Sequence, residues 1–372
     1  MNLNISARVD APIETLDVRA FRVPTEDGPE SDGTIIWDAT TLVLVSLSAG
    51  GRIGIGYTYA NTATAVVIRE TLHDIVVGSD PLCNGATWLN MVASVRNFGR
   101  DGIASMAISA VDVALWDLKG KLTDRPVCAL LGMSRHKVPI YGSGGFTSYS
   151  IAKLQSQLGD WAQAGIPRVK MKIGRAPHDD LKRVAAVRTA IGEAELFVDA
   201  NGAYSRKQAL DFADAFTRYG VSWYEEPVYH QDFEGLALLR KAAPPSMEIA
   251  SGEYGYGLYD FARMVDAQTV DVLQADATRC GGFTGLLAVD GLCQTKMIPL
   301  STHCAPHLHL HAGASLKTLR HMEYFFDHVR VEKMFFDGIP EPHGGTLSPD
   351  LGRPGIGLDF RHNDAERYAI WP

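Results

Sequence analysis

The 372-residue chain contains only five cysteines, and no two of them form a Cys-x-x-Cys pair. Because they are odd in number and widely spaced, they indicate neither a disulfide framework nor a zinc cluster. Long apolar runs are also lacking: no stretch reaches the roughly 18 apolar residues of a membrane span, and residues 1–17 lack the basic and apolar segments of a secretion signal. We therefore expect a cytoplasmic protein without a membrane partner.

Excess positive charge is lacking as well. The chain has 43 Asp and Glu against 35 Lys and Arg, which gives a formal net charge of -8, and its basic residues are not clustered. Because phosphate binding needs clustered Lys and Arg, a nucleic-acid partner is not expected. A hydrophobic fraction of 46% with 36 Gly and 18 Pro is typical of a soluble globular protein with many loops. We expect chemistry on a small molecule.

Two patterns of hydrophobicity divide the chain. Residues 17–60 alternate in short strand-like runs, with Gly50-Gly51 as a hairpin turn between two of them. Residues 103–122 carry apolar side chains at helical spacing. Together these segments predict a first domain in which helices pack on an antiparallel sheet.

From about residue 137, short apolar runs alternate with longer amphipathic stretches, which is the pattern of repeated βα units and a parallel sheet. The spacing of these runs is what one strand, one helix and two loops require, so the pattern predicts an eight-stranded barrel. The eight strand candidates are residues 138–143, 168–173, 196–201, 222–227, 248–253, 272–277, 298–303 and 321–326.

Polar residues occur at the ends of seven consecutive strand candidates. In a barrel of this kind the active site lies at the C-terminal ends of the strands. A single charge there is as well explained by exposure to solvent, but seven in a row are not. The residues are Lys170, Lys172, Asp199, Asn201, Glu225, Glu253, Asp276, His303 and Glu323.

Three of these residues are carboxylates on adjacent strands. Asp199, Glu225 and Glu253 are expected to point their oxygens at one spot, and an oxygen-only site with open positions suits Mg²⁺ better than Zn²⁺. Glu226 follows Glu225 directly and should face the other side of the strand, so we expect it to be structural.

The remaining strand-end residues include candidate bases. Lys170 and Lys172 are two apart on a strand and should share a face, where their mutual repulsion and a nearby metal are expected to lower their pKa values. Asp276 and His303 end neighbouring strands, an arrangement in which a carboxylate orients an imidazole and raises its basicity. Each pair therefore offers a base or an acid.

These residues, in this order, make the chain similar to the enolase superfamily, and within it to the mandelate racemase subgroup. The resemblance covers almost the whole chain, and its motifs are weak singly but specific together. They are Val169-Lys170-Met171-Lys172-Ile173-Gly174, Val198-Asp199-Ala200-Asn201, Tyr224-Glu225-Glu226-Pro227, Ser251-Gly252-Glu253, Gln274-Ala275-Asp276, Thr302-His303 and Met322-Glu323.

The resemblance implies a fold, which is a TIM-like (β/α)7β barrel, of the α/β class, with an N-terminal α+β capping domain. The implied limits are 1–130 for the capping domain and 131–350 for the barrel, with the tail 351–372 packing back on the cap. A mobile capping segment is expected in residues 22–39. Its polar residues either form a lid that does not suit a phenyl ring as in mandelate, or only solvate a surface loop. Relatives are often symmetric oligomers, so a homo-oligomer is expected by analogy.

The resemblance also implies roles for the strand-end residues. Asp199, Glu225 and Glu253 would bind Mg²⁺, Lys172 would act as base on one face of the substrate, and His303, supported by Asp276, on the other. Glu323 would donate a hydrogen bond to a substrate carboxylate, Lys170 would neutralise it, and Asn201 would touch the substrate. These roles are typical of the superfamily that serves as a standard example of a Lys or His base working with Mg²⁺.

The expected activity is removal of the proton next to a substrate carboxylate, through an enediolate. With two bases of this kind, dehydration of a sugar acid to a 2-keto-3-deoxy acid is the first expectation, and racemisation, epimerisation or cycloisomerisation of a 2-hydroxy acid is the alternative. The sequence does not name the substrate, because loop shape and cap contacts set specificity in such folds.

Three other interpretations are weaker. A zinc hydrolase is conceivable from the alternate histidines His307, His309 and His311, but they follow the seventh strand, where a helix is expected. A nicotinamide dehydrogenase would need a third glycine after Gly54-Ile55-Gly56 and a following helix. A non-catalytic relative would be expected to have lost ligands or bases, and none is missing here.

Overall fold

The computed structural model describes residues 11–371. Its N-terminal part is a sheet in the order β17-β1-β4-β5, covered by short helices and by the long helix α4. We refer to this part as the cap. The strands of the cap sheet are β1 (Thr15–Pro24), β4 (Ala39–Ala49), β5 (Arg52–Tyr59) and β17 (Ala369–Trp371). Its helices are α1 (Ala63–Val67), α2 (His73–Val76), α3 (Asn84–Ser94), α4 (Ile103–Thr123) and α5 (Val127–Leu130).

The predicted hairpin turn is confirmed. Ala49 pairs with Arg52 across β4 and β5, so that Gly50 and Gly51 form a two-residue loop. Both have positive φ angles, 54° and 71°. Paired positive φ values match the twist of a hairpin and are adopted most readily by glycine.

Glycine at two positions of β5 lets α4 approach the sheet. A Cβ atom on Gly56 would lie 2.2 Å from the carbonyl oxygen of Ala110, and one on Gly54 would lie 2.4 Å from the Cβ of Leu118. The Gly54-Ile55-Gly56 sequence is therefore a packing feature within a strand, and the dehydrogenase interpretation of it is wrong.

Changing Gly56 to alanine should destabilise the protein by about 1–3 kcal/mol, because the new methyl group overpacks a contact made by backbone atoms. Gly291 in helix α11 is the matched control, since an added Cβ there meets open space. Gly291→Ala is expected to stabilise the fold by ~0.5–1 kcal/mol. Urea unfolding of both variants is the measurement, and equal shifts in the two would contradict the close contact between α4 and β5.

Eight parallel strands follow the cap in the order β6 to β13, and β13 pairs with β6 to close the barrel. Seven helices, α6 to α12, connect them, so the predicted (β/α)7β fold is confirmed. All eight strand candidates are strands, with ends that differ by at most two residues from those predicted. The strands are β6 (Val138–Gly144), β7 (Arg168–Lys172), β8 (Glu195–Asp199), β9 (Val221–Glu225), β10 (Glu248–Ser251), β11 (Val272–Ala275), β12 (Leu300–Thr302) and β13 (Leu319–Phe325).

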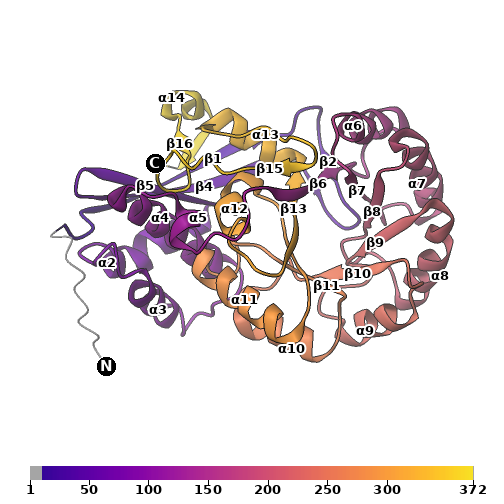
Figure 1. Ribbon diagram of the computed structural model, residues 1–372, viewed down its shortest axis with the longest axis horizontal. Coiled ribbons are helices and arrows are strands. Elements are labelled where there is room, and N and C mark those ends of the chain that lie inside the picture. The colour runs from indigo at the N-terminus through magenta and orange to yellow at the C-terminus, as the bar shows by residue number, and fades with distance from the viewer. Residues whose placement is uncertain (1–10, 372) are drawn as a thin grey trace.

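The helices form the outer layer of the barrel, and Figure 1 shows α6 to α10 as an arc around the strands. They are α6 (Ile151–Gln163), α7 (Pro177–Ile191), α8 (Arg206–Phe216), α9 (Phe233–Ala242), α10 (Leu258–Asp266), α11 (Gly282–Lys296) and α12 (Pro306–Gly313), followed by α13 (Phe326–Phe335). Side chains from alternate positions fill the barrel interior, among them the fully buried Trp223, which stacks on Phe197 at 5.1 Å between ring centroids.

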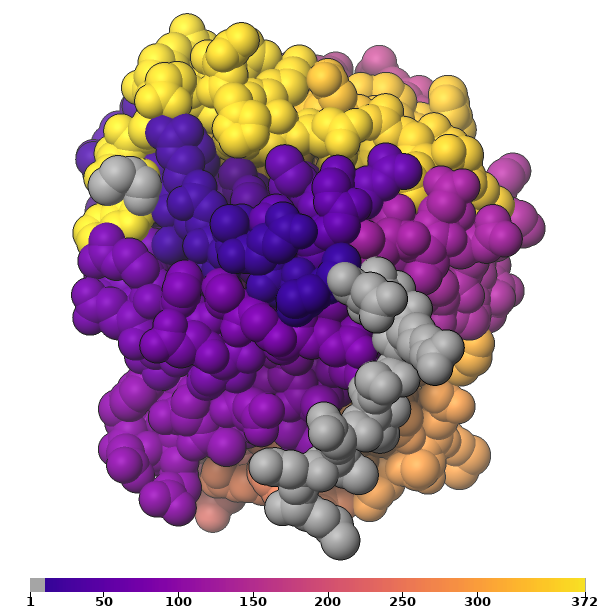
Figure 2. Space-filling model, turned by 90° about the vertical axis from the view of Figure 1, so that its left-hand side faces the viewer, coloured from indigo at the N-terminus to yellow at the C-terminus, as the bar shows by residue number. Residues whose placement is uncertain are grey.

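The C-terminal segment runs back over the cap. It contains β14 (Phe336–Asp337), β15 (Thr346–Leu347), β16 (Asp359–Phe360) and α14 (His362–Ala365) and ends in β17, which pairs with β1. Figure 2 shows these residues in yellow directly against the N-terminal strands in indigo. The buried carboxylate of Asp117 on α4 links the cap sheet to the C-terminal segment. It accepts hydrogen bonds at 2.7 Å from the backbone N–H groups of Ile55, on β5, and of Ile356, in the C-terminal segment.

Within residues 11–371, no helix combines the length and the apolar character needed to cross a bilayer. The limits predicted for the capping domain, the barrel and the tail stay predictions.

Candidate active site

The nine residues predicted from the strand ends come together at one end of the barrel. Eight of them, Asn201 excepted, are almost fully buried and joined by polar contacts, and Asn201 lines the same cavity as Lys172 and His303. They are held by the seven strands β7 to β13 or by the first residues after them, because the parallel strands all end at this face.

The three predicted metal-binding carboxylates form one cluster. One oxygen from each of Asp199, Glu225 and Glu253 lies within 4.8 Å of the others. Burial is nearly complete, and Glu253 Oε2 has no hydrogen-bond partner among the described residues. Burial and the charge of Asp199 raise the pKa of Glu225 well above its usual value. Three converging carboxylates, one with an unsatisfied oxygen, fit a hard divalent cation such as Mg²⁺.

The two lysines share a face of β7, as predicted, and both contact Asp199. Its Oδ2 lies 2.5 Å from the Nζ of Lys172 and 3.4 Å from that of Lys170, and Lys170 also lies 2.5 Å from Glu225 Oε1. Burial would raise the pKa of Asp199, but the two ammonium groups hold it at about 2.

The prediction that the lysine pKa values are lowered is wrong for this structure. Burial disfavours both ammonium groups, yet attraction to Glu225 and Glu323 at Lys170, and to Asp199 at Lys172, raises both pKa values above the usual range. The prediction weighed the repulsion between the lysines and a neighbouring cation, whereas direct contacts with buried carboxylates are stronger here.

His303 is oriented by Asp276, as predicted. Its Nδ1 lies 2.8 Å from Asp276 Oδ2, while the backbone N–H of Thr278 donates to Oδ1 at 2.7 Å. Burial opposes ionisation of Asp276, but the hydrogen bond from His303 holds its pKa well below the usual range. With Nδ1 donating to Asp276, the Nε2 of His303 faces the metal-binding side of the site, 3.2 Å from the Sγ of Cys304 and 3.4 Å from Glu253 Oε2.

Glu323 was predicted to donate a hydrogen bond, but in this structure it accepts hydrogen bonds. Its Oε1 accepts from Ser143 at 2.6 Å and lies 2.8 Å from the Nζ of Lys170, and its Oε2 accepts from the backbone N–H of Cys304 at 2.7 Å. Burial would raise the pKa of Glu323, but Lys170, with His303 and Lys172, holds it well below the usual value. In this structure Glu323 is therefore an ionised acceptor.

Glu226, which follows the metal-binding candidate Glu225, accepts a hydrogen bond from the hydroxyl of Ser251 at 3.2 Å. It is not part of the group of three carboxylates that could hold a metal. Burial and the charge of Glu253 raise its pKa well above the usual value, so a neutral structural carboxyl is favoured.

The histidines of the zinc-hydrolase interpretation lie on helix α12, not on a strand. Their ring nitrogens have separate partners: His307 contacts Glu332 at 2.5 Å, His309 accepts from the backbone N–H of Ala277, and His311 accepts from that of Cys128. These three histidines do not form a metal-binding group, and this support for a zinc hydrolase is lost.

A cavity of about 630 Å³ opens above the site, between the barrel and the cap. Its walls include residues that the strand-end pattern did not single out. They are Asp32, Trp37, Thr40, Tyr59, Asn61, Tyr254, Arg279, Asp327 and His328. Asp327 and His328 follow β13 much as His303 follows β12, and both lie within three residues of the end of the strand. The same strand-end pattern, extended by three residues, therefore includes them. The cap residues carry no comparable signal, because their position depends on docking of the cap.

Arg279 lies three residues after Asp276 and is held at the site. It donates to the carbonyl oxygen of Glu253 at 3.0 Å, and its Nε lies 3.7 Å from Asp276 Oδ2. Although burial disfavours its charge, Glu253 and Asp276 raise its pKa above the usual value. A fixed cation thus borders both the carboxylate cluster and the His303 pair.

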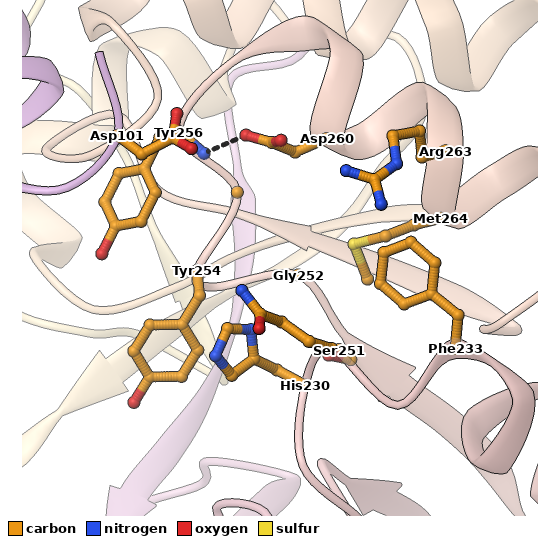
Figure 3. Close-up of a pocket in the computed structure, with 12 residues that line it drawn as sticks. Asp101, His230, Phe233, Ser251, Gly252, Tyr254, Tyr256, Asp260, Arg263 and Met264 are labelled. Carbon is orange, nitrogen blue, oxygen red and sulfur yellow. Dashed lines mark hydrogen bonds between the residues drawn. The ribbon is translucent and has the colours of Figure 1, made fainter. Parts of the chain in front are cut away.

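A second cavity, of about 410 Å³, lies beside the first, and Tyr254 lines both. Figure 3 shows the His230 ring next to Tyr254 and the Asp260 carboxylate accepting from the backbone N–H of Tyr256. None of the nine predicted residues lines this cavity. The chemistry therefore belongs to the first cavity.

The predicted capping segment forms a hairpin over the barrel, with β2 (Glu30–Ser31) pairing with β3 (Ile36–Trp37). Glu30 is buried and accepts a hydrogen bond from the hydroxyl of Tyr149 at 2.8 Å. Burial and the neighbouring Asp327 raise the pKa of Glu30 to about 8. Glu30 therefore holds a proton in the folded protein that the unfolded chain releases at lower pH.

This proton makes stability depend on pH. Between the unfolded and folded pKa values, the folded state binds more protons, so the free energy of unfolding should fall as pH rises towards 8, by at most about 1.4 kcal/mol per pH unit. Glu30→Gln should remove this slope, whereas Glu26→Gln, at an exposed position on the same segment, should keep it. Urea-unfolding midpoints at pH 6, 7 and 8 test this, and parallel slopes in both variants would contradict it.

Comparison with known proteins matches two family models. Residues 153–365 match the enolase C-terminal domain-like model, and residues 17–132 match the N-terminal domain of mandelate racemase and muconate lactonizing enzyme. A 3,6-anhydro-alpha-L-galactonate cycloisomerase from Streptomyces coelicolor is 30% identical over 92% of this chain and 96% of its own length.

Solved structures agree in fold. A mandelate racemase/muconate lactonizing enzyme-like protein from Rubrobacter xylanophilus is 52% identical, with a TM-score of 0.94 over 96% of this chain and 100% of the other. L-talarate dehydratase from Polaromonas sp. JS666, complexed with Mg and L-glucarate, is 27% identical with a TM-score of 0.85, over 97% of this chain and 98% of the other. With both family models matched in order and the barrel and cap in place, this chain belongs to the mandelate racemase/muconate lactonizing enzyme family of the enolase superfamily.

Proposed function

We propose that the protein is a Mg²⁺-dependent dehydratase that removes water from a sugar acid and releases a 2-keto-3-deoxy acid. The observation that carries this proposal is that Lys172 and His303 line one cavity together with Glu253. A base and an acid bordering the same space is what removal of a proton and of a hydroxyl group requires. The dehydratase named among the solved relatives supports the proposal.

Asp199, Glu225 and Glu253 would hold the metal. Bound there, Mg²⁺ supplies positive charge that stabilises the negative charge developing on the substrate carboxylate as the neighbouring proton leaves. When Asp199 binds a cation, it stabilises the charged form of Lys172 less, which favours the neutral amine that a base must be.

Lys170 and Glu323 would receive the substrate carboxylate. The ammonium group of Lys170 neutralises it, and Asn201, whose Oδ1 is buried without a partner, contacts a substrate hydroxyl. An arriving carboxylate adds a like charge beside Glu323 and so favours its protonated, hydrogen-bond-donating form.

The proposed dehydration removes one proton from carbon 2 and one hydroxyl group from carbon 3. Lys172 takes the proton from carbon 2, and the electrons of that C–H bond first move onto the substrate carboxylate as an enediolate. In a second step they form the new double bond to carbon 3. The bond between carbon 3 and its hydroxyl oxygen breaks, and His303 donates the proton with which that hydroxyl leaves as water. The resulting enol moves one proton from oxygen to carbon 3 and becomes the 2-keto acid. Asp276 stabilises the charged ring of His303 before it donates.

The test is incubation of the protein with Mg²⁺ and a library of sugar acids in D₂O, following both deuterium at carbon 2 and 2-keto acid. Keto acid from one stereoisomer is the expected result. Deuterium exchange with inversion and no keto acid would instead make the protein a racemase or epimerase. Turnover of an anhydro acid or a lactone without water loss would make it a cycloisomerase, and no signal on any acid would refute the proposal.

A further inference from the structure

The cavity carries different charges on its two sides. Among the described residues that line it, the permanent cations are Lys172 and Arg279, and both lie at the barrel side, in contact with Asp199 and Glu253. The wall formed by the cap and the start of α13 has carboxylates and neutral polar groups instead. They are Asp32, Trp37, Thr40, Asn61, Asp327 and His328.

Asp327 is the main charge on this cap-side wall, and it is 1% exposed. Its Oδ2 accepts hydrogen bonds from Trp37 Nε1 at 3.1 Å and from Thr40 Oγ1 at 3.3 Å. The nearest cation is Arg330, whose Nη2 lies 3.7 Å from Oδ1 and which does not line the cavity. Oδ1 is buried, and Glu30 lies within hydrogen-bond reach of the carboxylate. The two donors therefore fix Oδ2 at the wall, as the oxygen that a ligand hydroxyl would meet.

Glu30 neighbours Asp327, and its raised pKa shows that a second negative charge at this wall is unfavourable. Glu30 retains its proton because it is buried and because the charge of Asp327 lies beside it, and Lys153, which pairs with Asp27 at 2.8 Å, offsets this only in part. A further carboxylate brought to the same wall by a substrate would meet the charge of Asp327 and that of Asp32. Juxtaposed like charges of this kind oppose binding strongly.

His328 supplies a neutral donor at the same wall. Its Nδ1 accepts a hydrogen bond from the backbone N–H of Ala305 at 3.1 Å, so Nε2 carries the ring proton. The ring stacks on Tyr59 with 3.4 Å between centroids. Burial and the nearby His303 lower its pKa well below the usual value, and a ring of this kind lacks the positive charge that would hold a second carboxylate.

We infer that the substrate is a monocarboxylic sugar acid, an aldonate, whose end remote from the carboxylate carries a hydroxyl group facing Asp327 and His328. A hydroxyl both donates and accepts hydrogen bonds, and this wall offers an anionic acceptor beside a neutral donor. A second carboxylate accepts only, and would meet Asp327 without a free cation. The inference rests on the proposed function and identifies the substrate class for the same site.

The test compares each aldonate with the aldarate of the same configuration, such as gluconate with glucarate and galactonate with galactarate, by 2-keto acid formation with Mg²⁺. We expect kcat/KM to favour the aldonate of the active configuration by at least about tenfold. Turnover of an aldarate at an equal or higher kcat/KM would overturn the inference and leave the proposed function standing. Absence of both keto acid and deuterium exchange on every acid would refute the proposed function itself.

Two variants test whether the cap-side wall causes the preference for an aldonate over an aldarate. Asp327→Asn removes its charge and should lower the aldonate-to-aldarate ratio of kcat/KM about tenfold, and Asp32→Asn, a second variant, should lower it in the same direction. Asp38→Asn is the matched control, because Asp38 lies in the same segment as Asp32, residues 22–39. It pairs with Arg22 at 2.8 Å and does not line the cavity. An unchanged ratio in both wall variants, or an equal change in the control, would overturn the assignment.

Discussion

Replacing His303 by asparagine is expected to lower the kcat of keto-acid formation by about 10²- to 10⁴-fold while exchange of the carbon-2 proton for deuterium continues. Exchange persists because Lys172, on β7, still takes the proton. Keto acid does not form because the hydroxyl has lost its proton donor. The two signals are measured in one reaction by NMR in D₂O, which separates proton removal from water loss.

A variant of Lys172 distinguishes loss of proton removal from loss of the proton donor. Lys172→Met should abolish both exchange and keto acid, since no proton leaves carbon 2. His343→Asn, which changes an exposed histidine on a surface turn, should leave both signals as they are. If His303→Asn lost exchange and Lys172→Met kept it, the two bases would have been assigned the wrong way round.

Glu253→Gln is expected to have the second large effect, on metal binding. It removes one of three carboxylates that lie within 4.8 Å of one another. The dissociation constant of Mg²⁺, measured by calorimetry without substrate, should rise by more than the 10- to 100-fold typical of losing an outer partner of a metal site. Keto-acid formation should fall in parallel, and EDTA should abolish it in the unchanged protein until Mg²⁺ is added back.

Glu248→Gln is the control for this experiment, because Glu248 lies at the opposite end of the same strand, β10, and pairs with Arg320. Its Mg²⁺ affinity should be that of the unchanged protein. Recovery of activity with Zn²⁺ but not Mg²⁺ would instead point to His303, Cys304 and Glu323, a neighbouring group with mixed donors that suits zinc. Unchanged Mg²⁺ affinity in Glu253→Gln would place the metal elsewhere.

Much of the barrel and its site could be predicted because the physics there is local. An apolar run that closes with a charged residue is one strand and its C-terminal end, and eight apolar runs at regular spacing, seven of them closed in this way, have few other solutions. The contact between Asp276 and His303 follows from this, since neighbouring parallel strands in register bring their ends together.

The charge states could not be predicted in the same way. Two lysines on one face suggested repulsion, but their pKa values depend on which carboxylate each Nζ reaches, and that is set by side-chain packing. Glu323 was assigned as a donor, whereas Lys170, Ser143 and the backbone of Cys304 surround it with donors. Such partners come from three different segments and leave no pattern in any one of them.

The cap side of the cavity was the least predictable part. The contact of Trp37 with Asp327 joins residues that are far apart in sequence, and it exists only because one hairpin docks on one helix. The polar character of residues 22–39 was visible, but not which of its residues face the barrel.

The pairing of β17 with β1 has a consequence for synthesis of the chain on the ribosome. Ala20 finds its partner Trp371 only after about 350 further residues have been made, which at 5–20 residues per second is roughly 20–70 s. Throughout this time the outer edge of β1 presents unpaired backbone groups, the kind of surface on which chains associate. A polypeptide released from the ribosome before residues 369–371 are made would keep that edge open, so β17 protects the cap sheet from self-association.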